Sequence, residues 1–87
     1  MRYRKLFQSE NDNLGAFLRD IRKRAHIGQV ELAARLEVPQ SYVSKYERGE
    51  RRLEIVEFVM VCRHLGLDPV ETLSKFLTSD PSAFQQD

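Results

Sequence analysis

The chain of 87 residues is 41% hydrophobic and carries a net charge of +1, which excludes a disordered polypeptide and indicates one small domain. Its apolar runs are all shorter than the roughly 18 residues that a membrane span needs, and its start, "MRYRKLFQSEND", lacks the apolar stretch of a secretory signal. The single cysteine, Cys62, cannot form an internal disulfide. We therefore expect a reduced, cytoplasmic protein with no membrane contact.

The charges are unevenly distributed along the sequence. Residues 1–52 hold 12 Lys and Arg against 7 Asp and Glu, whereas residues 53–87 hold 2 against 6. A basic half favours contact with an anionic partner such as nucleic acid. The imbalance is modest, so a solvated surface with uneven charge is the alternative.

The apolar residues first recur with a helical period around residues 14–21. One face of this predicted helix carries Leu14, Phe17, Leu18 and Ile21. Either Asn11 or Asn13 is expected to cap its start. Residues 1–12 are predicted to form a basic arm, which either lies on a partner or is a plain disordered terminus.

Two short helices follow, with a tight turn between them. The first, around residues 29–36, comes after Gly28 and has a buried stripe of Leu32, Ala33 and Leu36. The second is expected to start at Pro39, whose missing N–H has no helical partner there, and to end at Gly49. Its inward-facing residues are Val43 and Tyr46.

Two more helices complete the predicted domain. The fourth runs from about Ile55 to Leu65, with one face formed by Ile55, Phe58, Cys62 and Leu65. The fifth starts at the "LDP" sequence, with Asp68 as its cap, and its apolar side is formed by Val70, Leu73, Phe76 and Leu77. The sequence thus predicts a compact all-α domain of five helices over residues 13–78, followed by a flexible tail over residues 79–87.

The second and third predicted helices are best interpreted together, as one structural motif. The third is apolar on one side and carries on the other a set of side chains that form hydrogen bonds but contribute little to a core, namely Gln40, Ser41, Tyr42, Ser44 and Lys45. Two short helices joined by a tight turn, the second with a polar outer face, are typical of a helix-turn-helix. In that motif the polar face enters the major groove of DNA.

A family resemblance spans Leu14 to about Leu67, and its most specific parts are "LRDIRKR", "GQVELAARL", "SYVSKYERG" and "LGLDP", in this order. Together they resemble the XRE-type helix-turn-helix family, which includes the phage lambda-type repressors and Cro. The resemblance implies a lambda-repressor-like five-helix fold. It also implies a DNA-binding transcriptional regulator, a homodimeric repressor that reads an inverted repeat in double-stranded DNA with its third helix.

The resemblance also implies roles for individual residues, although each is an ordinary surface residue in the alternative interpretation. The positions that read bases correspond to Gln40, Ser41, Ser44 and Lys45. The positions near DNA phosphates correspond to Gln29, Tyr42, Arg48, Arg51 and Arg52. Arg22 and Glu47 match a structural ion pair that orients the third helix.

The sequence departs from the family pattern around the turn. Glu37 stands where the family often has Gly, and at a positive φ it costs about 1 kcal/mol relative to Gly. Pro39 stands where Ser or Thr commonly caps the third helix, and it offers no capping oxygen. These departures leave the fold intact but affect how the third helix begins.

A second apolar stripe lies beside the expected core face of the fourth helix and continues on the fifth. We expect a homodimer through this stripe, formed by Val56, Val59, Met60, Leu73, Phe76 and Leu77. Two-fold symmetry gives such proteins affinity and specificity that one recognition helix lacks. In the alternative, the fifth helix covers the stripe and the chain is a monomer.

Catalysis finds little support in the sequence. His26 and His64 have no nucleophile motif nearby, and neither a glycine-rich phosphate loop nor a paired-cysteine metal site is present. We therefore expect no enzyme activity, no cofactor and no metal. A protein-interaction module remains as the alternative to a DNA-binding regulator. It would bind a protein partner through the C-terminal half, as an antitoxin does.

Overall fold

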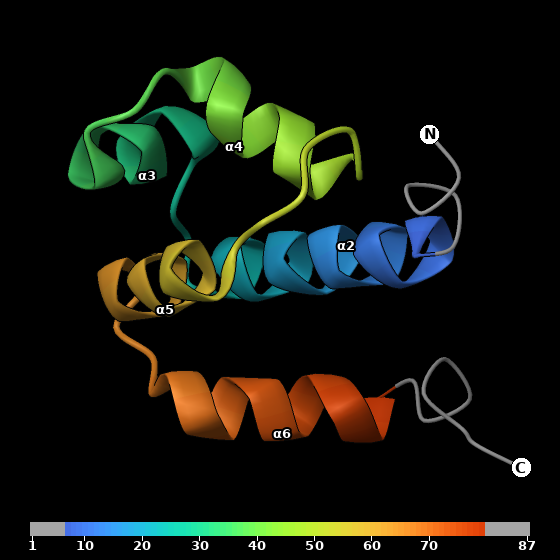
Figure 1. Ribbon diagram of the computed structural model, residues 1–87. Helices are drawn as coiled ribbons and strands as arrows, with labels where there is room; N and C mark the ends of the chain where they lie inside the picture. The colour runs from blue at the N-terminus through green and yellow to red at the C-terminus, as the bar shows by residue number, and fades with distance from the viewer. Residues whose placement is uncertain (1–6, 80–87) are drawn as a thin grey trace, which may run out of the picture.

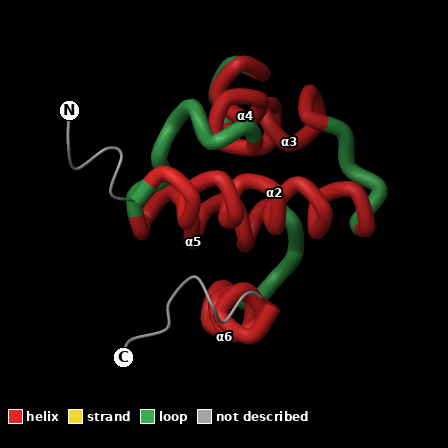
Figure 2. The backbone as a smooth tube through the Cα atoms, turned by 90° about the vertical axis from the view of Figure 1, so that its right-hand side faces the viewer, coloured by secondary structure: helices red, strands yellow, loops and turns green. Residues whose placement is uncertain are grey.

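The computed structural model describes residues 7–79, which form five α-helices and no strand. The helices are α2 (Gln8–Arg24), α3 (Gln29–Leu36), α4 (Gln40–Glu47), α5 (Ile55–His64) and α6 (Pro69–Ser79). In both views, α3 and α4 lie together on one side of α2 and α5, and α6 lies on the other side (Figures 1 and 2). The predicted all-α fold is confirmed.

The first helix begins earlier than the sequence pattern indicates. Residues 8–12 were expected in the basic arm, but α2 starts at Gln8. Asn11 caps no helix start, because it lies in the first turn, where its Nδ2 donates to the Phe7 carbonyl at 2.8 Å. The Gln8 side chain donates to Asp12 Oδ1 at 2.8 Å and to the Gly49 carbonyl at 3.0 Å. This contact with the loop after α4 stabilises the extra turn. The rest of the predicted arm, residues 1–6, lies outside the described residues.

The hydrophobic core lies where α2, α3, α4 and α5 meet. Each of these helices contributes at least one side chain with no exposed surface, namely Leu18, Leu32, Val43 and Val61. Tyr46 and Ala33 are also buried, and Leu14, Phe17, Ile21 and Leu36 pack around this centre. The apolar stripes predicted for the first three helices therefore face inward.

The inward face of α5 differs from the prediction at its first residue. Ile55 was expected in the core, but its side chain is 82% exposed. It is the first residue of the helix, next to the capping residue Glu54. The core stripe is instead Phe58, Val61, Cys62 and Leu65, which follow the i, i+3, i+4, i+7 spacing of one helix face.

Helix α6 packs on the rest of the domain through the face that carries its buried residues, Thr72 and Phe76. The Asp68 side chain caps the helix by accepting a hydrogen bond from the Val70 N–H at 3.1 Å, as predicted. Phe76 was expected in a dimer interface, but it is 4% exposed because its ring packs against Phe17, with a centroid separation of 5.3 Å. Leu73 and Leu77 are exposed. The helix includes Ser79, the first residue of the predicted tail, and the remaining tail residues lie outside the described part of the chain.

The turns around α4 determine where this helix begins and ends. Glu37 has φ of 59°, which is a left-handed conformation. This agrees with its place in the turn, where the family often has Gly. Pro39 is the residue before the helix rather than its first residue, and no side chain caps α4. Gly49, with φ of 76°, ends the helix as predicted. Among residues 7–79, no helix combines the length and apolar character needed to cross a membrane.

Candidate nucleic-acid interface

Helix α4 packs tightly on α2 with one face and is exposed on the other. At Gly15 the two backbones are so close that a Cβ atom would lie 2.3 Å from the Tyr46 carbonyl oxygen and 2.8 Å from that of Glu47. With this face buried, the opposite face of α4 exposes Gln40, Ser41 and Lys45. The structure therefore places three of the four predicted base-reading residues on one outer surface, with Ser44 partly buried at its edge.

The expected ion pair between Arg22 and Glu47 is present and buried. Arg22 Nε donates to Glu47 Oε2 at 2.7 Å, and Arg22 Nη2 donates to Glu47 Oε1 at 3.0 Å. A third bond runs from Arg22 Nη1 to the Ile27 carbonyl at 2.7 Å. The hydrogen bond to Glu47 raises the pKa of Arg22. This two-bond geometry fixes the end of α4 relative to α2.

Two glutamines extend this pair to the exposed surface. Gln29 Nε2 donates to Glu47 Oε1 at 2.9 Å, and Gln40 Nε2 donates to Gln29 Oε1 at 3.1 Å. The sequence predicts Gln29 and Gln40 as two separate DNA contacts. Each is the first residue of its helix, and the tight turn brings these two helix starts together. A chain of hydrogen bonds thus runs from buried Arg22 to exposed Gln40.

Tyr42 and Arg51 meet at a residue that sequence reasoning did not single out, Glu57 of α5. The Tyr42 hydroxyl donates to Glu57 Oε2 at 2.8 Å, and Arg51 Nη2 donates to the same oxygen at 2.5 Å. The Arg51 guanidinium also lies over the Tyr42 ring, 4.5 Å from its centroid. Burial raises the pKa of Tyr42, and the backbone N–H of Glu54 helps to lower the pKa of Glu57. Tyr42 therefore supports Arg51 through Glu57.

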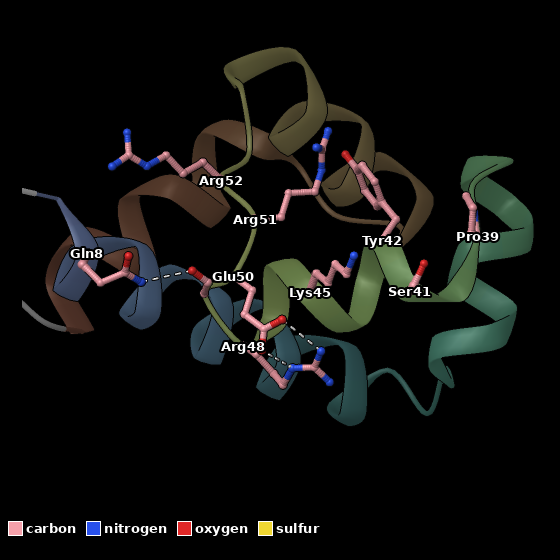
Figure 3. Close-up of a pocket in the computed structure, with 10 residues that line it drawn as sticks. Gln8, Pro39, Ser41, Tyr42, Lys45, Arg48, Glu50, Arg51 and Arg52 are labelled. Atoms are coloured by element: carbon pink, nitrogen blue, oxygen red, sulfur yellow. Dashed lines mark hydrogen bonds and ion pairs between the residues drawn. The ribbon is translucent and has the colours of Figure 1, made fainter. Parts of the chain in front are cut away.

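Basic side chains surround a shallow hollow of about 850 Å³ beside α4 (Figure 3). Its cationic lining residues are Lys45, Arg48, Arg51 and Arg52, all predicted to contact DNA. Figure 3 shows Lys45 and Arg51 near Tyr42, whereas Arg52 extends away from them. Arg48 forms an ion pair with Glu50. The hollow therefore has a predominantly positive lining with one carboxylate among the described residues around it.

A second hollow, of about 350 Å³, lies between α2 and α4 on the other side of Arg48. Arg19 and Lys23 line it together with Gln29 and Ser44. Neither cation is among the DNA contacts predicted from the sequence, because the first helix is recognised there by its core face alone. Their i, i+4 spacing, on either side of the ion-pair residue Arg22, was the available signal.

The sequence matches a helix-turn-helix domain family over residues 13–74, and it matches no curated protein. Solved structures similar to the chain include an XRE-family like protein from Pseudomonas syringae pv. tomato. That protein is 42% identical, with a TM-score of 0.77, over 90% of this chain and 95% of the other.

Two further structures are named as regulatory proteins. The clp gene regulator ClgR from Corynebacterium glutamicum is 30% identical, over 79% of this chain and 73% of the other, with a TM-score of 0.72. The restriction-modification controller protein C.AhdI from Aeromonas hydrophila is 28% identical, over 74% of this chain and 97% of the other, with a TM-score of 0.69. With its helix-turn-helix geometry and these relatives, the chain belongs to the XRE-type helix-turn-helix family of DNA-binding transcriptional regulators.

Proposed function

We propose that the protein is a homodimeric, sequence-specific repressor that inserts α4 into the major groove of DNA at an inverted repeat. The observation that carries this proposal is the fixed orientation of α4. A buried ion pair and a backbone approach at Gly15 attach the helix to α2. Its outward side chains, with Gln40, Ser41 and Lys45, are left exposed for base edges.

Among the proposed base-reading residues, Gln40 has the side chain that is most clearly oriented by its neighbours. Its side-chain N–H donates to Gln29 Oε1 at 3.1 Å, and Gln29 is itself oriented by Glu47. The amide of Gln40 therefore has a defined direction, with its oxygen and second N–H available for the two-bond pairing that Gln makes with adenine. Lys45 lies one turn beyond Ser41 on the exposed face, where an ammonium suits the O6 and N7 atoms of guanine.

Phosphate contacts follow from the basic linings on both sides of α4. We assign Arg48, Arg51 and Arg52 to one phosphate strand, and Gln29 with Arg19 and Lys23 to the other. Cationic side chains on both sides of a recognition helix position it in the groove without reading sequence. Tyr42 contributes by holding Arg51 through its ring and through Glu57.

The dimer interface we propose is the exposed apolar surface of α5 and α6. Val56 is 70% exposed, and Ile55, Met60, Leu73 and Leu77 are also exposed. Val56 and Met60 border a small hollow of about 240 Å³, which Leu36 and Val38 also line. An apolar surface of this kind on a small domain marks an interface. A dimer seated on promoter DNA would repress by covering it.

The test is a selection of bound duplexes from random DNA at about 0.1 M salt. We expect an enriched inverted repeat with half-site centres about 10–11 base pairs apart, or a multiple that fits the dimer. A single unpaired site would contradict the dimer. Salt-sensitive binding without any enriched sequence would contradict sequence-specific reading.

The same apolar surface supports a second candidate function, the binding of another protein through the C-terminal half. The acidic balance of residues 53–87 and the exposure of Ile55 and Val56 favour this candidate. Sedimentation distinguishes the two, because a homodimer covers this surface itself. A 10.2 kDa monomer at tens of micromolar would favour the protein partner.

A further inference from the structure

Arg48, the first residue after α4, forms an ion pair with the carboxylate of Glu50. Its Nε donates to Glu50 Oε2 at 3.0 Å, and its Nη2 donates to Glu50 Oε1 at 3.2 Å. Its Nη1 donates to Ser44 Oγ at 2.7 Å. Figure 3 shows this pair beside Lys45, and all three residues line the hollow. The two-bond contact uses the same guanidinium edge that would bind two oxygens of a phosphate.

The pair contributes little to the fold. The side chains of Arg48 and Glu50 are 57% and 55% exposed, and exposed ion pairs are typically weak because water and salt screen them. Within the described residues, Glu50 has no side-chain hydrogen-bond partner besides Arg48. By contrast, Glu57 accepts bonds from Tyr42, Arg51 and the Glu54 backbone N–H. Glu57 is therefore built into the structure, whereas Glu50 is free to exchange its partner.

The position of Glu50 is unfavourable for a DNA-binding surface. It is the one acidic residue among the described residues that line the hollow, which also contains Lys45, Arg51 and Arg52. Interaction with Arg48 lowers the pKa of Glu50, so its carboxylate is negatively charged at neutral pH. A phosphate that approaches Arg48 meets this charge and must compete with it for the guanidinium.

We infer that Glu50 is a specificity-determining residue of the DNA interface. Its carboxylate competes with DNA phosphates for the Arg48 guanidinium. Arg48 leaves Glu50 for a phosphate only where correctly placed base contacts add enough binding free energy. Non-specific binding depends almost entirely on phosphate contacts, so the competing carboxylate weakens it directly. At the correct sequence, hydrogen bonds from α4 to base edges offset the loss. This inference rests on the proposed DNA-binding function.

The test compares wild type with Glu50→Gln, which keeps the size of the side chain but removes its charge. Affinity is measured on a random duplex and on the selected site, over a series of salt concentrations. We expect random-duplex affinity to rise about 3- to 10-fold and selected-site affinity to rise less, so that the specificity ratio falls. The slope of log K against log salt should steepen by about one on the random duplex, as Arg48 gains a phosphate.

A matched control is available in Glu31→Gln. Glu31 forms a similar exposed ion pair with Arg35 at 2.6 Å, on α3, and lines neither basic hollow. This variant loses the same charge, and we expect its affinities and salt slope to match those of wild type. Melting temperatures of both variants should stay close to that of wild type, since both pairs are exposed.

The double variant Arg48→Gln/Glu50→Gln decides whether Glu50 acts through Arg48. We expect the gain from Glu50→Gln to disappear in the Arg48→Gln background. If the gain persists there, or if Glu50→Gln strengthens both duplexes equally, the inference is wrong. A wild-type protein that binds no duplex would instead refute the proposed function.

Discussion

At the scale of single residues, Tyr46 has a polar group with no evident function. Its hydroxyl is buried and has no hydrogen-bond partner among residues 7–79, while its ring is 2% exposed and packs edge-on against Tyr42. Burial strongly raises the pKa of this hydroxyl. A buried donor without a partner costs stability, because folding removes its hydrogen bonds to water.

We therefore predict that Tyr46→Phe raises the free energy of unfolding by about 1 kcal/mol. For a domain of this size, the melting temperature would rise by about 4–8 °C. Thermal and denaturant unfolding measure the change. Tyr42→Phe is the control, because it loses a bond to Glu57 of 2.8 Å and should be less stable than wild type. A less stable Tyr46→Phe variant would show that its hydroxyl has a partner after all.

The sequence predicted which side chains of α4 face outward, but it did not predict the ion pairs that the arginines of this surface form. Gln40, Ser41 and Lys45 were identifiable because polar side chains opposite Val43 and Tyr46 must face outward. The pairing of Arg48 with Glu50 and of Arg51 with Glu57 was not predicted. These pairs depend on the path of the loop after α4, which brings together residues whose spacing follows no helical period.

At the scale of helices, the sequence predicted interiors better than ends. The period of apolar residues identifies the core stripes of α2, α3 and α4, because burial requires a continuous face. The start of α2 was misplaced because its first turn is stabilised by Gln8 bonds to Asp12 and to the distant Gly49. Ile55 was misassigned because the apolar period already starts at the first residue of α5, before the helix reaches the core.

The contact between α2 and α4 gives a prediction at this scale. Gly15→Ala places a methyl group against the carbonyl oxygens of Tyr46 and Glu47, so the two helices must separate. We expect the free energy of unfolding to fall by about 1–3 kcal/mol, as in other overpacked sites. DNA affinity should fall at temperatures where the variant is still folded, because α4 shifts. Circular dichroism and DNA titration measure the two effects.

Gly28→Ala is the matched control for this variant. Gly28 has a φ of −77°, which any residue adopts, and an added Cβ would meet no atom of the described residues within 4 Å. We expect a cost below about 1 kcal/mol, from the weaker capping preference of Ala. Equal effects of the two substitutions would show that the close approach of the helices at Gly15 does not matter.

At the scale of the whole molecule, the proposed DNA surface and the exposed apolar surface belong to different helices, and they adjoin at the hollow that Tyr42 lines together with Val56 and Met60. Helix α4 lies on one side of α2 and α5, whereas α6 lies on the other (Figure 1). The exposed apolar residues on α5 and α6 are therefore available to a second copy while α4 contacts DNA. In the dimer we propose, association through α5 is expected to place two recognition helices on one duplex, which is the geometry that an inverted repeat requires.

Val56→Glu tests this arrangement directly. A carboxylate at the 70% exposed Val56 leaves the monomer core unchanged, but it would have to be buried without a partner in the proposed interface. We expect sedimentation to show a monomer where wild type is a dimer. Affinity for the full inverted repeat should fall at least 10-fold, towards the affinity for a single half-site. Val30→Glu is the control for association, because Val30 is 67% exposed on α3, outside the proposed interface. If Val56→Glu still sediments as a dimer, the subunits associate through another surface, and the two α4 helices must be spaced differently on DNA.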